Sequence, residues 1–302
     1  MTEIDPNIKL LEDLTPEVER LYDRHLESKE KKGEWHPYEL VPYSHGRDYQ
    51  SGDEWRPDEY DLSDGVRSAL FVNLLTEDNL PYYYETIHRW SPPNREHPWS
   101  EWARQWTSEE DNHATVIREW IHVTRAIDPL KLDKARSVQI KSGEVPQPDD
   151  LTDMLVYTSL QELATRVAHS GTGRILGDEF GGFDVMSHVA GDEQLHHIFY
   201  RDLARAAFAL DPSAMMIAAE RQLRGFDMPG TGIPGFRDHA RAIQKTGIYN
   251  FTKFKKNVVD PTFEKWHIDE IEDLSDEAKE ARDKIHKRLN QLDKAAAREQ
   301  RR

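Results

Sequence analysis

Glutamate and histidine residues three positions apart are the first candidates for chemistry in this sequence. On a helix, residues three apart lie on the same face, so such a pair can present a carboxylate and an imidazole to one metal ion. The chain contains five pairs of this kind: Glu85/His88, Glu110/His113, Glu119/His122, Glu193/His196 and Glu264/His267. Because one pair alone is weak evidence, its helical surroundings must decide which pairs could form a site.

Two of the five pairs lie on apolar helical faces. The face of Glu110 and His113 also carries Trp99, Ala103, Trp106, Ile117 and Trp120, and the face of Glu193 and His196 carries Met186, Val189, Tyr200, Leu203 and Ala207. The pair at 119 and 122 follows the pair at 110 and 113 by nine residues on the same helix. It therefore lies about half a turn round the helix axis from that pair and should face solvent. The pairs at 85 and 264 follow prolines, the first near a helix end and the second in polar sequence. The pairs 110/113 and 193/196 are therefore the predicted ligands.

Two further glutamates lie on comparable faces. Glu77 shares its face with Val66, Leu70, Leu74 and Leu80, and Glu162 shares its face with Leu151, Leu155, Thr158 and Thr165. Glu77 precedes Glu110 by 33 residues, and Glu162 precedes Glu193 by 31. This repeat predicts two helical hairpins, each with a glutamate on its first helix and a Glu-x-x-His pair on its second. Dimetal carboxylate bundles have this ligand pattern.

The charges of the six candidate ligands balance those of two divalent ions. Four buried carboxylates without counter-ions would cost on the order of several kcal/mol each. Two divalent cations neutralise them, and the neutral imidazoles add no charge. The mixed oxygen and nitrogen donors favour iron or manganese over magnesium or calcium. The alternative, that these are interior polar groups with other partners or surface pairs, does not explain four helices with matching spacing.

Long helices must position these ligands, and the sequence predicts an all-α bundle. A polar helical arm is expected from roughly Pro16 to Lys31, followed by an ordered loop over 35–64. From Val66 to about Leu210, helical patterns alternate with short breakers, and no segment has the alternation of a strand. Breakers or loops are expected at 91–94, 141–150, 171–182 and 225–235, with a helix over 236–246.

We expect residues 1–302 to form a single domain, because no low-complexity linker divides the chain. Its core should span about 16–250. The charged extension at about 264–302 has no wide apolar face, so it should be either a solvated helix or frayed.

Composition narrows the functional classes. The net charge of −16 argues against nucleic-acid binding, because phosphate contacts require a basic surface. The absence of cysteine excludes disulfides, thiolate metal sites and cysteine nucleophiles, and it fits a cytoplasmic location. No apolar run is long enough for a membrane span, and the first residues lack the apolar core of a secretory signal.

Four segments around the candidate ligands resemble those of the soluble acyl-[acyl-carrier-protein] desaturases, in particular the actinobacterial, mycobacterial-type members. They are TEDNLP at 76–81, WTSEEDNH at 106–113, QELAT at 161–165 and DEQLH at 192–196. EWHPYELVP at 34–42 and HSGTGR at 169–174 resemble further segments of that family, and the resemblance extends over roughly residues 20 to 250.

The resemblance implies a homodimeric, ferritin-like di-iron bundle. The reaction it implies is oxygen-dependent insertion of a cis double bond into a saturated acyl chain on acyl carrier protein, with electrons from a ferredoxin-like donor. By position, Glu77, Glu110, His113, Glu162, Glu193 and His196 would bind two iron ions, with Glu110 and Glu193 bridging. Thr165 would be a proton relay, and Asp192 and Trp35 would link His113 to the surface; alternatively, Thr165 is a small helix residue and Trp35 a packing anchor.

The sequence departs from the plant members in a shorter turn between the first two ligand helices, in the glycine-rich 171–182 segment and in the tail beyond about residue 260.

Because acyl carrier protein is acidic, docking needs a local basic patch. Candidates are Arg201, Arg205, Arg221 and Arg224, or Lys245, Lys253, Lys255 and Lys256. Two other functions remain open: a different ferritin-like dimetal oxidase or oxygenase, such as a hydroxylase or N-oxygenase, and a non-catalytic acyl-carrier-binding or metal-storage protein.

Overall fold

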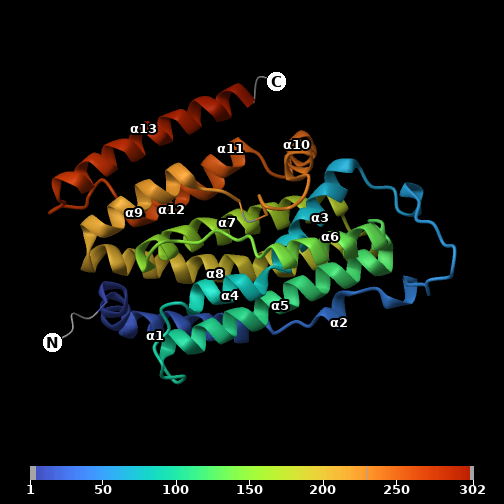
Figure 1. Cartoon of the computed structure of the whole chain (residues 1–302), viewed down its shortest axis with the longest axis horizontal. Helices are drawn as coiled ribbons and strands as arrows, with labels where there is room; N and C mark the ends of the chain where they lie inside the picture. Colours follow the sequence, from blue (N-terminus) through green and yellow to red (C-terminus); the bar gives the residue numbers. More distant parts are fainter. Residues whose placement is uncertain (1–4, 229, 300–302) are drawn as a thin grey trace.

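The structure is a computed structural model that describes residues 5–228 and 230–299. Over these residues the chain is helical and contains no strand, which confirms the all-α prediction. Figure 1 shows the helices as a bundle, with α7 and α8 through its middle and α13 along one edge. No helix in the described residues is long and apolar enough to cross a lipid bilayer.

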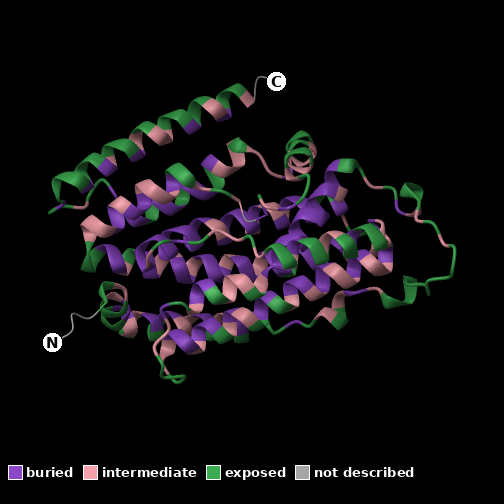
Figure 2. Ribbon diagram, in the orientation of Figure 1, coloured by how far each residue is buried: buried purple, intermediate pink, exposed green. Residues whose placement is uncertain are grey.

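Five long helices make up the centre of the bundle. They are α1 (Pro6–Lys32), α3 (Asp64–Glu77), α5 (Pro98–Thr124), α7 (Leu151–Leu176) and α8 (Gly182–Leu210). The other helices surround them: α2 (Pro37–Leu40), α4 (Leu80–His88), α6 (Pro129–Ser142), α9 (Pro212–Gly225), α10 (Phe236–Thr246), α11 (Phe251–Phe254), α12 (Asp260–Trp266) and the long outer helix α13 (Asp276–Glu299). Figure 2 shows that burial is concentrated on α3, α5, α7 and α8.

Local capping explains where the ligand-bearing helices begin. The Ser63 side chain accepts a hydrogen bond from the amide of Val66 at the start of α3, and Asp150 does the same for Asp153 at the start of α7. Such caps satisfy amides that have no partner within the helix. The two predicted hairpins therefore form, one from α3 and α5 with α4 between them, and one from α7 and α8.

The first helix begins earlier than predicted. It starts at Pro6, not Pro16, and Pro16 lies inside it. Asp5 caps the new start by accepting a hydrogen bond from the amide of Asn7. Leu11, which precedes the predicted start of the helix, is fully buried in the core. Tertiary packing thus outweighs the helix-breaking tendency of proline here.

The predicted breaker at 171–182 is wrong in its first half. Helix α7 continues through Gly171 and Gly173 to Leu176, and the chain turns only at Gly177, which has a positive φ of 65°. These glycines permit close packing. A Cβ atom on Gly171 would lie 2.5 Å from the carbonyl oxygen of Ile248, and one on Gly173 would lie 2.8 Å from the Cβ of Met186.

The C-terminal helix α13 packs more closely than its charged sequence suggested. It lies along α9 and α11, and its narrow apolar stripe is buried: Ala278, Ala281, Ile285, Leu292 and Ala296. At its end, the Glu299 carboxylate accepts hydrogen bonds from the backbone amide and the hydroxyl of Thr252. The predicted loop at 35–64 contains α2 and two short 3-10 turns, Tyr43–His45 and Pro57–Glu59.

Candidate metal centre

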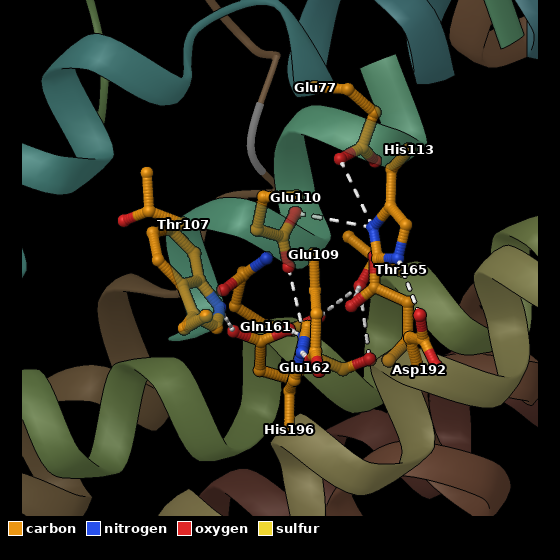
Figure 3. Close-up of polar contacts among 12 residues, drawn as sticks. Glu77, Thr107, Glu109, Glu110, His113, Gln161, Glu162, Thr165, Asp192 and His196 are labelled. Carbon is orange, nitrogen blue, oxygen red and sulfur yellow. Dashed lines mark hydrogen bonds and ion pairs between the residues drawn. The ribbon is translucent and has the colours of Figure 1, made fainter. Parts of the chain in front are cut away.

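The four ligand-bearing helices bring the six predicted ligands together in the interior of the bundle (Figure 3). Glu77 lies in the last turn of α3, and Glu162 lies near the middle of α7. The two Glu-x-x-His pairs lie within α5 and α8. All six side chains are buried.

The ligand atoms form two overlapping groups, in each of which all atoms lie within 4.8 Å of one another. One group contains Glu77, Glu110, His113 and Glu193, and the other contains Glu110, Glu162, Glu193 and His196. Glu110 and Glu193 belong to both groups. Each group therefore has three carboxylates and one imidazole, with the two shared carboxylates placed to bridge two ions.

Distances around the two histidines agree with this arrangement. His113 Nδ1 lies 3.4 Å from Glu110 Oε2 and 3.9 Å from Glu77 Oε2. His196 Nδ1 lies 2.9 Å from Glu110 Oε1 and 3.6 Å from Glu162 Oε2. The other oxygen of Glu162 accepts a hydrogen bond of 3.1 Å from the indole of Trp106, which orients this carboxylate.

Several of these atoms have unused bonding capacity. Within the described residues, His113 Nδ1, His196 Nδ1, Glu110 Oε1 and Glu162 Oε2 are buried and make no hydrogen bond of suitable geometry, although His196 Nδ1 and Glu110 Oε1 are 2.9 Å apart. Buried polar atoms without partners are rare in folded proteins, because each one loses its hydration. All four point into the same cluster of donors (Figure 3). The residues present therefore fit a pair of metal ions.

Electrostatics also favours bound cations. Burial raises the pKa of Glu77 to about 7, and burial together with the nearby charge of Glu193 raises the pKa of Glu162. Burial opposes ionisation of Glu110 as well, but His113 and His196 lower its pKa below the ordinary value. Without metal, the centre must hold protons to reduce repulsion between its carboxylates. Two divalent ions remove that repulsion without protons.

Thr165 lies on α7 beside the bridging position. Its hydroxyl donates to Glu193 Oε2 at 2.8 Å and also lies 3.0 Å from the carbonyl oxygen of Glu162. The Thr165 hydroxyl therefore lies next to two of the predicted ligands.

Asp192 and Trp35 lie next to His113. The indole of Trp35 donates to Asp192 Oδ2 at 3.0 Å, and the same oxygen lies 3.6 Å from His113 Nε2. The ring of Trp35 is nearly parallel to that of His113, with centroids 6.2 Å apart. Burial opposes ionisation of Asp192, but its contact with His113 lowers the pKa to about 2. A carboxylate in this position orients a metal-binding imidazole.

Glu109 is a site residue that the sequence reasoning missed. One of its oxygens lies 2.7 Å from His196 Nε2, and the other lies 3.0 Å from His25 Nε2 on α1. Burial opposes ionisation of Glu109, yet these contacts with His196 and His25 hold its pKa far below the ordinary value. A sequence feature could have found it, because an acid precedes the glutamate of both pairs: Glu109 before Glu110, and Asp192 before Glu193.

His169 also contacts two predicted ligands, although the sequence marks its segment, 169–174, only by its resemblance to a segment of the desaturase family. Its Nε2 lies 3.0 Å from Glu77 Oε1 and 3.6 Å from Glu193 Oε1. The remaining Glu-x-x-His pairs lie elsewhere, as predicted. Glu85 and Glu264 are exposed, and Glu119 accepts a hydrogen bond from Tyr43.

Comparisons with known proteins agree with this site. A family model described as fatty acid desaturase matches residues 6–302. The chain is 37% identical over 289 residues to DesA1 of Mycobacterium tuberculosis, which is assigned as an acyl-[acyl-carrier-protein] desaturase; the match covers 92% of this chain and 84% of DesA1. It is 27% identical to stearoyl-[acyl-carrier-protein] 9-desaturase 1, chloroplastic, of Arabidopsis thaliana, over 82% of this chain and 67% of the plant protein.

A solved structure supports the fold. The X-ray structure of DesA2 from Mycobacterium tuberculosis H37Rv, assigned as an acyl-ACP desaturase, superposes with a TM-score of 0.72. The match covers 90% of this chain and 99% of DesA2 at 21% sequence identity. The chain therefore belongs to the fatty acid desaturase family and is an oxidoreductase with the ferritin-like helical fold of the acyl-[acyl-carrier-protein] desaturases.

Proposed function

We propose that this protein is an oxygen-dependent di-iron desaturase, which inserts a cis double bond into a saturated fatty acyl chain carried on acyl carrier protein. The observation that carries the proposal is the pair of overlapping Glu/His groups with two shared carboxylates. The desaturase names of the relatives add the substrate class. The relatives include a 9-desaturase and a 6-desaturase at similar identity, so the position of the double bond is not part of the proposal.

The donor set suits iron. Glu77, Glu110, His113, Glu162, Glu193 and His196 would hold two ions through carboxylate oxygens and imidazole nitrogens. Iron supplies the redox chemistry for breaking an unactivated C–H bond, which no side chain can do. Overall, the acyl chain loses two hydrogens, a ferredoxin-like donor supplies two electrons, two further protons are taken up, and oxygen becomes two waters.

We assign the chain's own polar groups around the centre to proton and electron supply. Thr165 would hold a proton at its hydroxyl and pass it to Glu193, with which it already shares a 2.8 Å hydrogen bond. Asp192 would fix the orientation of His113, and Trp35 would fix Asp192. Trp35 keeps 8% of its surface exposed and contacts Asp192, which in turn contacts His113, so the three residues would form a continuous path from the surface to one ion.

An apolar cavity provides a place for the acyl chain. It has a volume of about 340 Å³ and lies between α9, α10, α11 and α13. Met228, Phe236, Ala240 and Tyr249 line it and also line a smaller inner cavity of about 90 Å³. The inner cavity reaches Asn73, four residues before Glu77, and Ala168, next to His169. A saturated chain entering here would approach the metal ligands through apolar walls.

Helix α10 offers a docking face for an acidic carrier beside this cavity. Arg237, Arg241 and Lys245 are exposed and spaced four residues apart, so they share one face of α10. In the two patches predicted from the sequence, Arg201, Arg221, Arg224 and Lys255 form ion pairs within the chain. Of the three cations on α10, Arg241 is paired as well, with the exposed Asp238 one turn earlier on the same helix. We therefore propose α10 as the carrier contact. A homodimeric assembly and a cytoplasmic location complete the proposal.

One experiment separates the three functions that the sequence left open. The protein is loaded with ferrous iron without oxygen, reduced, and exposed to oxygen with stearoyl- or palmitoyl-acyl carrier protein. An acyl product lighter by two hydrogen atoms supports the desaturase, whereas one heavier by one oxygen atom indicates a hydroxylase. An unchanged chain indicates a non-catalytic protein.

Two matched variants test whether formation of the acyl product depends on the proposed metal centre. Glu110→Ala removes a shared carboxylate and should abolish both iron binding and product. Glu264→Ala changes a glutamate of the same motif that is exposed on α12, and it should leave both unchanged. A Glu110→Ala protein that still forms product would refute the proposed site.

A further inference from the structure

Two acids that are not predicted ligands form a crossed arrangement around the centre. Glu109 on α5 contacts His196 on α8, with 2.7 Å between Oε2 and Nε2. Asp192 on α8 contacts His113 on α5, with 3.6 Å between Oδ2 and Nε2. The Glu109 contact is a hydrogen bond, whereas Asp192 lies at ion-pair distance from His113 Nε2, which has no hydrogen-bond partner among the described residues. Each acid thus faces the histidine of the opposite helix. In both cases the contact uses the imidazole nitrogen that points away from the predicted metal position.

A single lysine lies between these two acids. The ammonium group of Lys29 on α1 donates to Asp192 Oδ1 at 2.7 Å and lies 3.5 Å from Glu109 Oε1. Its side chain is only 11% exposed, so the charge is held in a largely dry environment. Lysine is almost never buried unless paired. Here the pairing is with both orienting acids at once.

The charge balance of the centre gives Lys29 a role. Two divalent ions neutralise the four predicted carboxylate ligands, which leaves the buried charges of Glu109 and Asp192 uncompensated. Lys29 supplies positive charge between them. Removing one partner from a buried ion pair is strongly destabilising, because the other charge stays buried without compensation.

We propose that Lys29 is a positioning residue for both metal ions, which it serves by holding Asp192 and Glu109 against the histidines of the two Glu-x-x-His pairs. Helix α1 has none of the predicted ligands, yet through Lys29 it sets the orientation of both imidazoles. The inference rests on the proposed metal centre and goes beyond it, because it makes the two ion sites depend on one residue outside the ligand set.

Each of the other side chains that contact these acids touches only one of the two, and so can influence only one of the two histidines. Trp35 donates to Asp192, which serves His113. His25 and Gln105 contact Glu109, which serves His196. A change at Trp35 should therefore affect mainly one ion, whereas a change at Lys29 should affect both. This difference distinguishes a shared positioning residue from a general packing residue.

The test is a titration of cobalt(II) into the metal-free protein. Calorimetry and the visible absorption of the bound ion monitor the titration and give the affinity of each binding event. For Lys29→Met we expect both binding events to weaken by roughly 10–100-fold, as is typical when the partner of a metal-binding histidine is disturbed. Lys29→Arg, which keeps the charge, should recover most of the affinity. Trp35→Phe should weaken one event, and the exposed Lys31→Met on the same helix should weaken neither.

Lys29→Met with wild-type affinity at both ions, or with only one ion weakened, would overturn the inference. If that variant does not fold, the cycle Glu109→Gln, Asp192→Asn and the double variant replaces it, because two acids that share Lys29 must have non-additive effects on cobalt affinity. Additive effects overturn the inference as well. Wild-type protein that binds fewer than two cobalt ions would instead refute the metal centre itself.

Discussion

At the scale of single residues, the Thr165 hydroxyl contacts Glu193, a predicted bridging ligand, but belongs to neither ligand group. Its effect on turnover can therefore be separated from its effect on metal binding. Thr165→Val has nearly the same shape and lacks the hydroxyl. We expect it to keep two iron ions per chain and to lower the rate of acyl product formation by roughly 100-fold or more, which is the usual size of a lost proton-transfer group.

Thr165→Ser is the matched control, because it keeps the hydroxyl and should keep most of the rate. Iron per chain and single-turnover product formation are measured on both variants. Equal rates for the valine and serine variants would show that Thr165 serves only packing.

The ionisable residues predict how the metal-free protein responds to pH. Burial raises the pKa of Glu77 to about 7. Burial opposes protonation of His169, but its contacts with Glu193 and Glu77 raise the pKa to about 9. Both groups hold protons more tightly in the folded chain than in the unfolded chain. These two groups therefore bind more protons in the folded chain between about pH 4.5 and 9, and the stability that they contribute falls as the pH rises through that range.

Thermal unfolding of metal-free protein between about pH 7 and 9 tests this slope. Five histidines whose pKa is lowered by burial oppose it only below their ordinary value of 6.5: His88, His97, His122, His197 and His239. The lowered pKa values of Glu109 and Asp192 add no slope there, because both acids are ionised in the folded and the unfolded chain. Metal-loaded protein should show a flatter dependence, since the ions replace the protons. A melting temperature that rises with pH in the metal-free protein would contradict the assignment.

The sequence predicted where the six candidate ligands lie but not what surrounds them. The apolar helical faces and the spacings of 33 and 31 residues can be read from the sequence alone. They were therefore enough to predict Glu77, Glu110, Glu162 and Glu193 as ligands without knowledge of the fold. Glu109 lies one residue before Glu110, and helical periodicity therefore places it outside the apolar face that carries Glu110 and His113. Its partners His25 and Lys29 come from α1, about 80 residues earlier, and only the packing of α1 on the bundle brings them close.

At the scale of elements, the glycines of α7 act through close packing. Gly171→Ala would place a Cβ atom 2.5 Å from the carbonyl oxygen of Ile248, so the segment before α11 must shift. We expect a loss of roughly 1–3 kcal/mol in the free energy of unfolding, as for other overpacked cores. Chemical denaturation of the metal-free protein measures it.

Gly191→Ala is the matched control on α8. A Cβ atom there meets no atom within 4 Å, so alanine should be neutral or slightly stabilising through its higher helix propensity. If both variants lose the same free energy, the close contact at Gly171 does not limit α7. The close contact at Gly171 is also the reason that the sequence misplaces the end of α7: glycine is typical of helix ends, but here its small size is needed inside the helix.

At the scale of the whole molecule, the C-terminal helix closes the apolar cavity. Leu292 of α13 lines this cavity, together with Phe254 of α11 and Leu223 of α9. Leu292→Trp should fill part of the space and raise the KM for the acyl carrier substrate several-fold, without changing iron content. Leu289→Trp, on the same helix but lining a different pocket, should leave that KM unchanged. Equal KM values for the two variants would place the acyl chain elsewhere.

The crossed acids and the shared carboxylates have a consequence for the order of assembly. The hairpin of α3 and α5 and the hairpin of α7 and α8 each carry half of the donors, but each ion position draws on both. A single hairpin emerging from the ribosome therefore has no finished position for an ion. In the proposed centre, a metal ion can meet its full ligand group only after the two hairpins have joined, so metal loading would report that these hairpins have packed together.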